Sequence, residues 1–495
     1  MIENNISILI SFIIYLLFML GVGWVYYTKT NTLSDYILGD RKLNSWVAAM
    51  SAQASDMSGW LLLGLPGYAY IAGLESVWIA VGLGVGTYIN WRFVARRLRK
   101  YTEVAGNAIT LPDYFENRFR DKSKSLRIIS ALFILIFFLI YTSSGFVAGA
   151  KLFSTVFDLS YTTALITGVL VIISYTFLGG FLAVSWTDFF QGIIMIIAIC
   201  AVPFAAVYNS GGITETINTI KNLNPELLNA FTTTDGKTIS AIAIISLLAW
   251  GLGYFGQPHI LARFMAIKNS DQITKARRIA MTWVIISLSF AVIVGLVGIA
   301  VLKTPLAKGA HETIFMVMVN TYIPSSLAGI FLAAILAAIM STADSQLLVT
   351  SSALTEDFYH VLFRRDASEK ELVWVSRFAV IAVSLIAFIF AMNPDSSVLG
   401  LVAYAWGGFG ATFGPIIILS LFWKRMTRNG ALGGIIGGGV TVLVWKQLNG
   451  GIFDLYEIVP GFIVSVLAIV IISLMDKEPP QEIIDEFDSI ESSNV

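Results

Sequence analysis

The sequence predicts an all-α integral membrane protein with about 13 transmembrane helices. Two observations lead to this fold class. Of the 495 residues, 56% are hydrophobic and only 13% are charged, whereas a soluble chain carries about 25% charged residues. The apolar residues also form long runs, near the roughly 20 residues that a helix needs to cross a ~30 Å hydrocarbon core. A soluble multidomain protein is therefore excluded.

The first apolar run, residues 6–27, contains no charge, and only Glu3 precedes it. A cleaved signal peptide has a basic start and a shorter apolar core, so we expect this run to be a retained span. The remaining predicted spans follow in chain order, at residues 44–70, 75–94, 126–152, 161–183, 188–209, 240–258, 279–302, 326–350, 375–393, 399–423, 429–446 and 457–475. The strands of an outer-membrane barrel would be shorter and more polar.

The basic residues are distributed unevenly although the net charge is zero. With the N-terminus outside, the cytoplasmic connections from Lys29 to Lys477 hold 26 of the 32 Lys and Arg residues, with Arg263 among them. The other side receives only Lys151, Lys221, Lys237, Lys303, Lys308 and Lys446. Because this asymmetry sets orientation, we expect the N-terminus outside and the C-terminus inside. The acidic tail, residues 476–495, is expected to be disordered.

Several classes of function find no support in the sequence. Cys200 is the only cysteine and the three histidines share no metal-ligand spacing, so we expect neither a disulfide nor a metal centre. The glycines of 433–439 precede no Lys-Ser/Thr pair and favour helix packing over a phosphate loop. Without a nucleophile–base pair or nucleotide fingerprint, we expect no enzyme, no cofactor, no nucleic-acid partner and no obligatory protein partner.

Two spans differ from the others. The second contains the small and polar segment 51–59, followed by Gly64, Pro66 and Gly67, and the seventh contains three glycines and a proline within 250–259. Glycine lowers helix propensity and proline removes a backbone donor, so both spans are predicted to be broken. The alternative is two ordinary kinked helices.

The two broken spans occupy matching positions in the chain. The region 43–424 has its midpoint inside the external loop 210–239, which divides it into 43–209 and 240–424, each with five spans. An odd number of spans gives the halves opposite topology. Paired interrupted helices in inverted repeats indicate the binding site of a transporter. Residues 1–42 then add one helix and a cytoplasmic loop, and 425–475 add two helices.

Asp56 is the candidate for the chemistry at the break. At 1.5 Å per residue it lies roughly 18 Å inside its span, and the Gly251–Gly253 break lies at a similar depth from the other side. An ionisable group there costs several kcal/mol unless it is paired or hydrated, which favours a functional role over a helix cap. Ser55 and Ser58 flank it with hydroxyl oxygens, which suit Na⁺.

Further polar and aromatic residues are expected at the membrane depth of Asp56 or near it. Ser341 and Thr342 are adjacent hydroxyls that could complete an oxygen cage, although such residues often bond to their own helix. Asp188 is expected to begin the sixth span, as a helix-dipole partner or an ion ligand. Arg41 is a gate or a topology determinant. The aromatic residues Tyr141, Trp250 and Tyr254 suit a small solute with an apolar body and charged ends, packing being the alternative.

Several motifs in order resemble the sodium/solute symporter family over almost the whole chain. They are Asp35–Gly39, Ala54–Trp60, Leu111–Tyr114, Gly179–Asp188, Trp250–Phe264, Met340–Thr342 and Ser420–Gly437. The resemblance implies a LeuT-type fold, a five-plus-five inverted repeat with one extra helix before it and two after it. It also implies sodium-driven uptake of L-proline by alternating access, with Na⁺ as the co-transported ion, across the lipid bilayer of a bacterial cytoplasmic membrane.

The resemblance also implies roles for individual residues. It places a principal sodium site at the backbone of Ala54 and Met57 with Ala338, Ser341 and Thr342. It assigns Asp56, Ser58 and Gly59 to sodium and solute. The residues implied for the solute pocket and gate are Tyr141, Trp250, Tyr254 and Pro258, and Asp188 serves a second sodium site in some members.

Two alternatives remain at this point. One is sodium-coupled uptake of another small carboxylate or a betaine-like solute. The other is a membrane sensor with a transporter fold, which is disfavoured because the tail 476–495 is too short for a signalling domain. Asp344, just after the hydroxyl pair, leaves the local charge balance open.

Overall fold

The computed structural model describes residues 2–27, 32–176, 180–302, 304–307 and 309–492. Within these residues the regular structure is helical, apart from two isolated β-bridges. Lys29, Lys303 and Lys308 of the charge distribution, and Gly179 of the motifs, lie outside the described residues.

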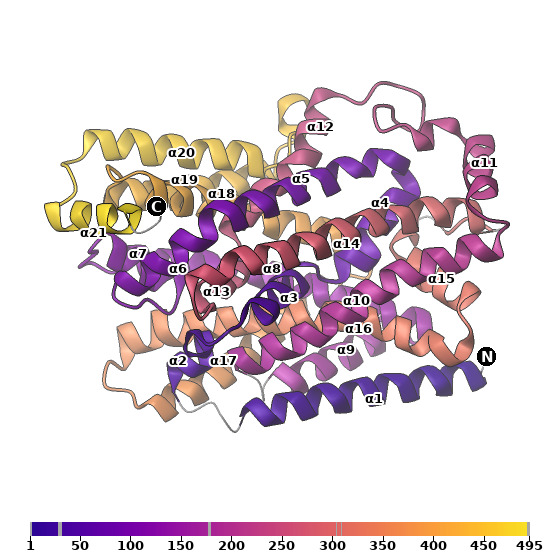
Figure 1. Ribbon diagram of the computed structural model, residues 1–495, viewed down its shortest axis with the longest axis horizontal. Coiled ribbons are helices and arrows are strands. Elements are labelled where there is room, and N and C mark those ends of the chain that lie inside the picture. The colour runs from indigo at the N-terminus through magenta and orange to yellow at the C-terminus, as the bar shows by residue number, and fades with distance from the viewer. Residues whose placement is uncertain (1, 28–31, 177–179, 303, 308, 493–495) are drawn as a thin grey trace.

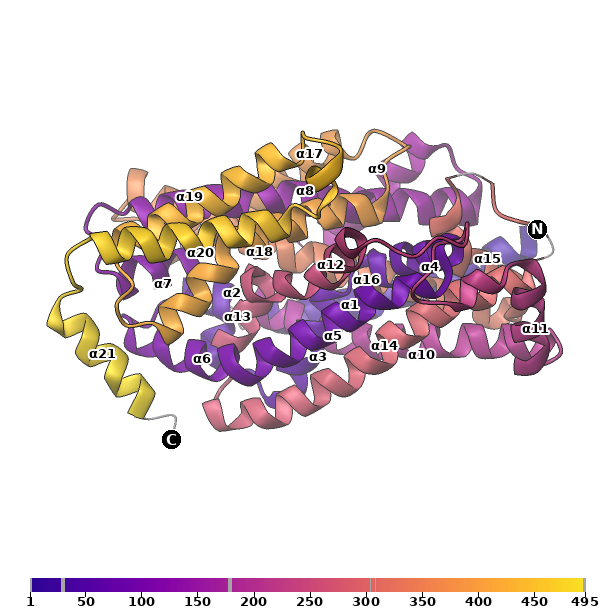
Figure 2. The same cartoon turned by 90° about the horizontal axis from the view of Figure 1, so that it is seen from above.

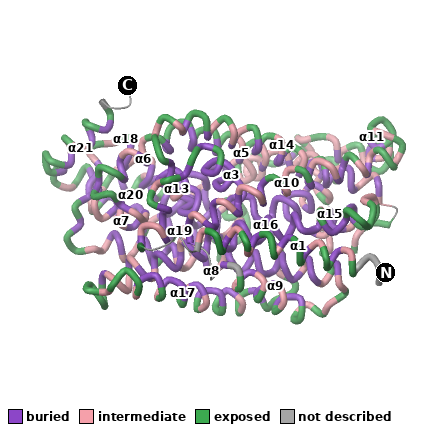
Figure 3. Tube along the Cα trace, turned by 60° about the horizontal axis from the view of Figure 1, so that its bottom comes forward, coloured by how far each residue is buried: buried purple, intermediate pink, exposed green. Residues whose placement is uncertain are grey.

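Each predicted span overlaps a helix or a broken pair of helices, although the fifth, predicted as 161–183, was too long, because its helix ends at Thr176 and residues 181–183 belong to the next helix. The unbroken ones are α1 (Ile2–Tyr27), α5 (Val77–Ile89), α8 (Ser125–Phe157), α9 (Tyr161–Thr176), α10 (Phe181–Asn209), α14 (Ile273–Val301), α16 (Ser325–Ser352), α17 (Glu369–Phe390), α18 (Val398–Phe422), α19 (Arg428–Trp445) and α20 (Ile458–Met475). They form one elongated bundle, with buried residues along its centre (Figures 1 and 3). In the described part of the chain, nine helical segments are long and apolar enough to cross a membrane, and a bent pair makes a tenth.

The second span is broken as predicted. Its first half, α3 (Ser45–Asp56), begins where the Asn44 side chain accepts hydrogen bonds from two free N–H groups, and it ends in the middle of the bundle. Met57 leaves the helical conformation, with φ −86° and ψ 75°. The chain then resumes as a π-helical turn, η2 (Trp60–Gly64), and α4 (Leu65–Ala72).

The seventh span is also broken, and it is longer than predicted. It consists of α12 (Ala241–Leu248), the 3₁₀ segment η6 (Ala249–Gly256) and α13 (Pro258–Ala266), with a 45° bend. Proline can begin α13 because the first turn of a helix does not use its N–H groups. Glycine is required at Gly253, where a Cβ atom would lie 1.8 Å from the Trp406 indole nitrogen.

The two broken spans run in opposite directions. The Leu43 N–H donates to the Ala266 carbonyl at 3.1 Å, and the Lys268 N–H donates to the Leu43 carbonyl at 2.9 Å. The start of α3 therefore lies beside the end of α13, and the two helices lie together in both views (Figures 1 and 2). This antiparallel pairing is what an inverted repeat requires of its two opening helices.

The connections between spans contain further helices. The third span reaches its predicted end in η4 (Asn90–Val94), and the helix continues beyond it as α6 (Ala95–Val104). The other added helices are α2 (Leu33–Leu38), α7 (Leu111–Arg118), α11 (Ile213–Leu223) and α15 (Ile314–Tyr322). These helices are too short to have been recognised as spans, because none carries a long apolar run.

The prediction of a disordered tail was wrong for most of its length. Residues Gln481–Ser492 form α21, which buries Ile483, Phe487 and Ile490. Its acidic residues face basic ones, and Glu486 lies 2.5 Å from Arg120. The apolar residues recur at helical spacing, so they form one buried face although the average composition is polar. α1 begins at the right end of Figure 1 and α21 lies at the left end.

We predict that Phe487→Ala releases α21 from the bundle. Phe487 is 4% exposed and packs against Tyr101, at 6.4 Å between ring centroids. Truncating a buried phenylalanine costs about 3–5 kcal/mol, enough to undock a short helix. Limited proteolysis should cleave the tail faster in this variant, whereas Asp485→Ala, at an exposed position, should leave cleavage unchanged. Equal cleavage rates in both variants would contradict the docking.

Candidate functional site

Asp56 ends α3 inside the bundle and joins both broken spans. The Tyr254 hydroxyl donates to its Oδ2 atom at 2.6 Å. The Tyr141 hydroxyl and the Trp60 indole N–H donate to its backbone carbonyl, at 3.3 and 3.1 Å. Asp56 is completely buried, and among the described residues its Oδ1 atom has no hydrogen-bond partner. A buried carboxylate oxygen without a partner is a binding position for a cation or an N–H donor.

Aromatic side chains surround this carboxylate. Trp250 lies 6.3 Å from Trp60 and 5.7 Å from Tyr456, between ring centroids. The Trp406 indole N–H donates to the Trp250 carbonyl at 2.7 Å, which satisfies a backbone group freed by the break. Trp60, Trp406 and Tyr456 were not among the predicted site residues. Trp60 stands in the motif of the second span, whereas Tyr456 lies in a connection outside the ten-span core and had no sequence signal.

The hydroxyl pair of α16 contacts the same break. The Ser341 hydroxyl donates to the Ala54 carbonyl at 2.7 Å, with the Ala338 carbonyl at 3.2 Å, and the Thr342 hydroxyl lies 3.4 Å from the Ala54 carbonyl. All four residues are buried. Hydroxyl and carbonyl oxygens converge here from two helices, which is a donor set that a hard cation prefers.

The three residues of the break itself differ in what they offer. Met57 is buried and its N–H remains bonded to the Gln53 carbonyl. The Ser58 N–H donates to the Asp56 carbonyl at 3.0 Å. A Cβ atom on Gly59 would lie 2.9 Å from Cβ of Ala148, so α8 approaches the backbone closely at this position. Only the main-chain groups of Gly59 can therefore contact a solute.

Asp188 does not begin its helix, and that prediction was wrong. α10 begins at Phe181, so Asp188 lies two turns inside it and is completely buried. Its Oδ2 atom accepts from the Ser51 hydroxyl at 2.6 Å and from Arg263 at 3.1 Å. The apolar run used to place this span began after the polar segment 185–188, and tertiary contacts compensate those polar groups instead.

Arg263 is the main residue that the sequence interpretation misplaced. It was counted in a cytoplasmic connection, but α13 extends to Ala266 and its side chain is completely buried. Its guanidinium donates to Ser51 at 3.0 Å, to Ser345 at 2.5 Å and to the His259 carbonyl at 3.0 Å. The Asp188–Arg263 ion pair therefore links α3, α10, α13 and α16. The resemblance motif that runs to Phe264 was the available signal.

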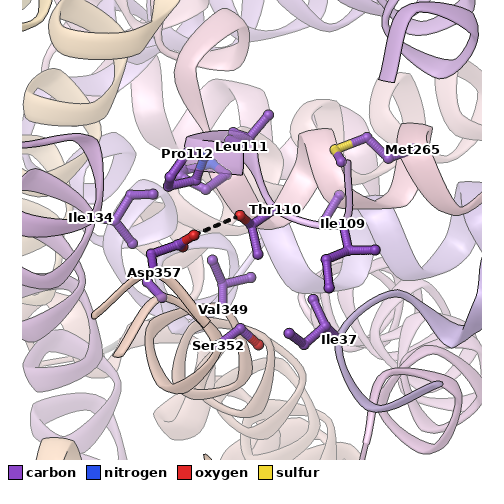
Figure 4. Close-up of a pocket in the computed structure, with 13 residues that line it drawn as sticks. Ile37, Ile109, Thr110, Leu111, Pro112, Ile134, Met265, Val349, Ser352 and Asp357 are labelled. Carbon is purple, nitrogen blue, oxygen red and sulfur yellow. Dashed lines mark hydrogen bonds between the residues drawn. The ribbon is translucent and has the colours of Figure 1, made fainter. Parts of the chain in front are cut away.

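Two further predicted residues, Pro258 and Arg41, take part in other contacts of the bundle. Pro258 lines a small cavity of about 30 Å³ beside Thr110 and Asp357 (Figure 4). Arg41 donates to the carbonyls of Met265 at 2.7 Å and Ala108 at 2.8 Å, which joins α13 to the segment before α7. Burial lowers the pKa of the Arg41 guanidinium to about 10, which leaves it charged at neutral pH.

A charged cluster next to this cavity was not predicted. Arg127 at the start of α8 pairs with Asp357 at 2.7 Å, Glu356 at 2.9 Å and Glu116 at 3.2 Å. Thr110 donates to the same Asp357 oxygen at 3.1 Å, as Figure 4 shows. The cluster holds α7, α8 and the end of the ninth span together. In the central site, Asp56, Tyr141 and Tyr254 are each at most 1% exposed.

Solved structures share this arrangement. A Na⁺-coupled sialic acid symporter in a substrate-bound outward-open state superimposes with a TM-score of 0.79, at 21% identity, over 96% of this chain and 99% of that one. A nucleobase-cation-symport-1 family transporter reaches 0.54 at 17% identity, over 89% and 94%. These likenesses concern the fold, and they confirm the predicted LeuT-type inverted repeat.

Relatives by sequence are much closer. The sodium/proline symporter of Salmonella typhimurium is 52% identical over 97% of this chain and 95% of its own length. The high-affinity proline transporter of Bacillus subtilis is 50% identical over 96% and 99%. The model of the sodium:solute symporter family matches residues 36–438. With that match over most of its length, and broken helices that meet at Asp56, the chain belongs to the sodium:solute symporter family.

Proposed function

We propose that this protein is a symporter that uses sodium to drive uptake of L-proline by alternating access. The observation that carries the proposal is the contact of the Ser341 and Thr342 hydroxyls with the Ala54 carbonyl, two residues before the buried Asp56. Two relatives that are half identical to this chain are named for proline transport, which supports the choice of solute.

We assign the sodium ion to the oxygens between α3 and α16. Its ligands are the carbonyls of Ala54, Met57 and Ala338 with the hydroxyl oxygens of Ser341 and Thr342, and Asp56 supplies negative charge nearby. A sodium ion at the Ala54 carbonyl replaces the hydroxyl hydrogens that contact it now. It thereby stabilises the broken end of α3, which also carries the solute site.

We assign proline to the space around Asp56. The free Oδ1 atom suits the secondary ammonium group, and the backbone N–H group of Gly59 suits the carboxylate, because the N-terminal end of a half-helix is partially positive. The pyrrolidine ring then packs on Tyr141 and Trp250. The Tyr254 hydroxyl orients the Asp56 carboxylate. Pro258 lies on the proposed path between this site and the cavity of Figure 4.

The proposed orientation places the N-terminus outside and the end with α21 in the cytoplasm of a bacterial cell. Residues 43–209 and 240–424 are the proposed inverted halves. Inward movement of one sodium charge then gains about 2.3 kcal/mol per 100 mV of membrane potential. If sodium strengthens proline binding, proline strengthens sodium binding by the same factor.

The direct test is uptake of labelled proline into proteoliposomes. We expect accumulation with an inward sodium gradient and none when choline replaces sodium. A tenfold excess of unlabelled proline should abolish the signal, whereas glycine betaine and other small carboxylates should not. Sodium-independent uptake would refute the coupling, and stronger competition by another solute would replace proline as the substrate.

We predict that Ser341→Ala weakens sodium binding. The change removes one oxygen ligand of a charged group, a contact typically worth about 1.5–3 kcal/mol, so half-maximal uptake should need about tenfold or more sodium. Ser351→Ala is the matched control, since Ser351 is buried on the same helix and donates to the Leu348 carbonyl. Equal sodium dependence in the two variants would remove Ser341 from the site.

We predict that Asp188 and Arg263 act as one unit. Either Asp188→Asn or Arg263→Gln alone leaves a buried charge without its partner, which costs about 3–5 kcal/mol. Both single variants should melt at clearly lower temperature in detergent, and the double variant should regain much of the loss. Sodium dependence of uptake in the double variant then measures the contribution of Asp188 to ion coupling. Additive losses of melting temperature would contradict the paired role.

A further inference from the structure

An apolar groove runs along the outside of the bundle between α5 and α14, which lie next to each other in Figure 3. Its volume is about 620 Å³, and its walls include Val81, Val85, Ile285 and Val292. Along α14 it extends from Met281 to Leu296, roughly 22 Å at 1.5 Å per residue. The groove therefore follows the helices over more than half of a ~30 Å hydrocarbon core.

One end of the groove carries three arginines. Tyr88 lines the groove, and the Arg277 guanidinium lies 5.8 Å from the centre of its ring. Arg277 and Arg278 come one turn before Met281 on α14, and Arg92 follows Tyr88 by one turn. Within the described part of the chain, none of these arginines pairs with a carboxylate, whereas their neighbour Arg96 pairs with Asp271.

The other end of the groove has the opposite character. Leu74, Val77 and Leu296 line this end, and Glu75 lies between Leu74 and Val77 in the sequence. Glu75 accepts a hydrogen bond from Tyr68 at 2.8 Å. A negatively charged head group is therefore attracted to the arginine end alone. The charges select one end of the groove and one membrane leaflet.

We propose that this groove binds an anionic phospholipid of the leaflet at the arginine end, with its phosphate on Arg277, Arg278 and Arg92 and an acyl chain between α5 and α14. Guanidinium groups bind phosphate through paired N–H donors, and basic pockets between transmembrane helices bind anionic head groups. The long, narrow, apolar walls fit a flexible chain. The site does not depend on which solute the protein transports.

The lipid site adjoins the transport core. α5 belongs to the first half of the chain and α14 to the second, and a Cβ atom on Gly82 or Gly86 in α5 would lie 2.3 or 2.2 Å from the carbonyl oxygen of Leu248 or Gly251, so α5 packs closely on the backbone of the seventh span. A chain held in the groove therefore stabilises the contact between the two halves on their outer side. The bound lipid contacts α5, which packs on the broken seventh span, and the lipid does not contact Asp56.

The test measures lipid binding with two kinds of variant. The purified full-length protein is placed in phosphatidylcholine nanodiscs, phosphatidylglycerol is titrated in, and retained lipid is counted by native mass spectrometry. Arg277→Gln with Arg278→Gln removes two of the three proposed phosphate ligands, and phosphatidylglycerol retention should fall about tenfold. Gly84→Phe keeps every charge but fills the groove, because a Cβ atom at Gly84 meets no neighbour within 4 Å. It should lower retention to a similar extent.

The control removes two exposed charges at the same end of the bundle. Arg365→Gln with Lys370→Gln should retain phosphatidylglycerol as the unmodified protein does. Loss in this control to the same extent would mean general charge attraction and would overturn the site, as would full retention in Gly84→Phe. Equal retention of phosphatidylcholine and phosphatidylglycerol by the unmodified protein would overturn the anionic preference. Monodisperse elution of each variant establishes that it is folded.

Discussion

The structure depends on one constraint: a helix that stops inside a membrane frees backbone polar groups that lipid cannot satisfy. α3 stops at Asp56, and two of the carbonyls near its end accept hydrogen bonds from side chains of other elements. The Asp56 carbonyl receives Tyr141 and Trp60, and the Ala54 carbonyl receives the α16 hydroxyls. The seventh span uses the Trp406 indole in the same way. The break is thus a junction of four helices, and a cation or solute that binds there acts on all of them.

The buried Asp188–Arg263 pair is a second junction, one that lies on the side of α3 toward α13. Breaking such a pair is costly although forming it gains little, so its value is in specifying one arrangement of helices. It connects the first broken span, through Ser51, with the second. Arg41 and the Arg127 cluster repeat this pattern nearer the end of the bundle. Polar contacts therefore join the helices around Arg41 and Arg127 at this end of the bundle.

The extent of prediction differed among elements for physical reasons. The apolar spans were predictable because the bilayer demands long apolar runs, and the breaks because glycine, proline and small polar residues interrupted two of them. Arg263 and the start of α10 were misplaced because polar residues interrupt the apolar run from which a span is predicted. In the folded protein these polar residues are buried, because partners such as Ser51 and Ser345 form hydrogen bonds with them. α21 was missed because its apolar face appears only at helical spacing.

The sequence by itself determined the fold class, the two broken helices and the identity of Asp56, Ser341 and Thr342 as candidates, since each follows from hydrophobicity, helix propensity and the cost of charge at depth. Only the tertiary structure decided which carbonyl or carboxylate oxygen each hydroxyl group contacts. It placed the Ser341 hydroxyl on the Ala54 carbonyl and the Tyr254 hydroxyl on Asp56, contacts between residues 287 and 198 positions apart. Such contacts depend on how helices pack, which no local pattern encodes.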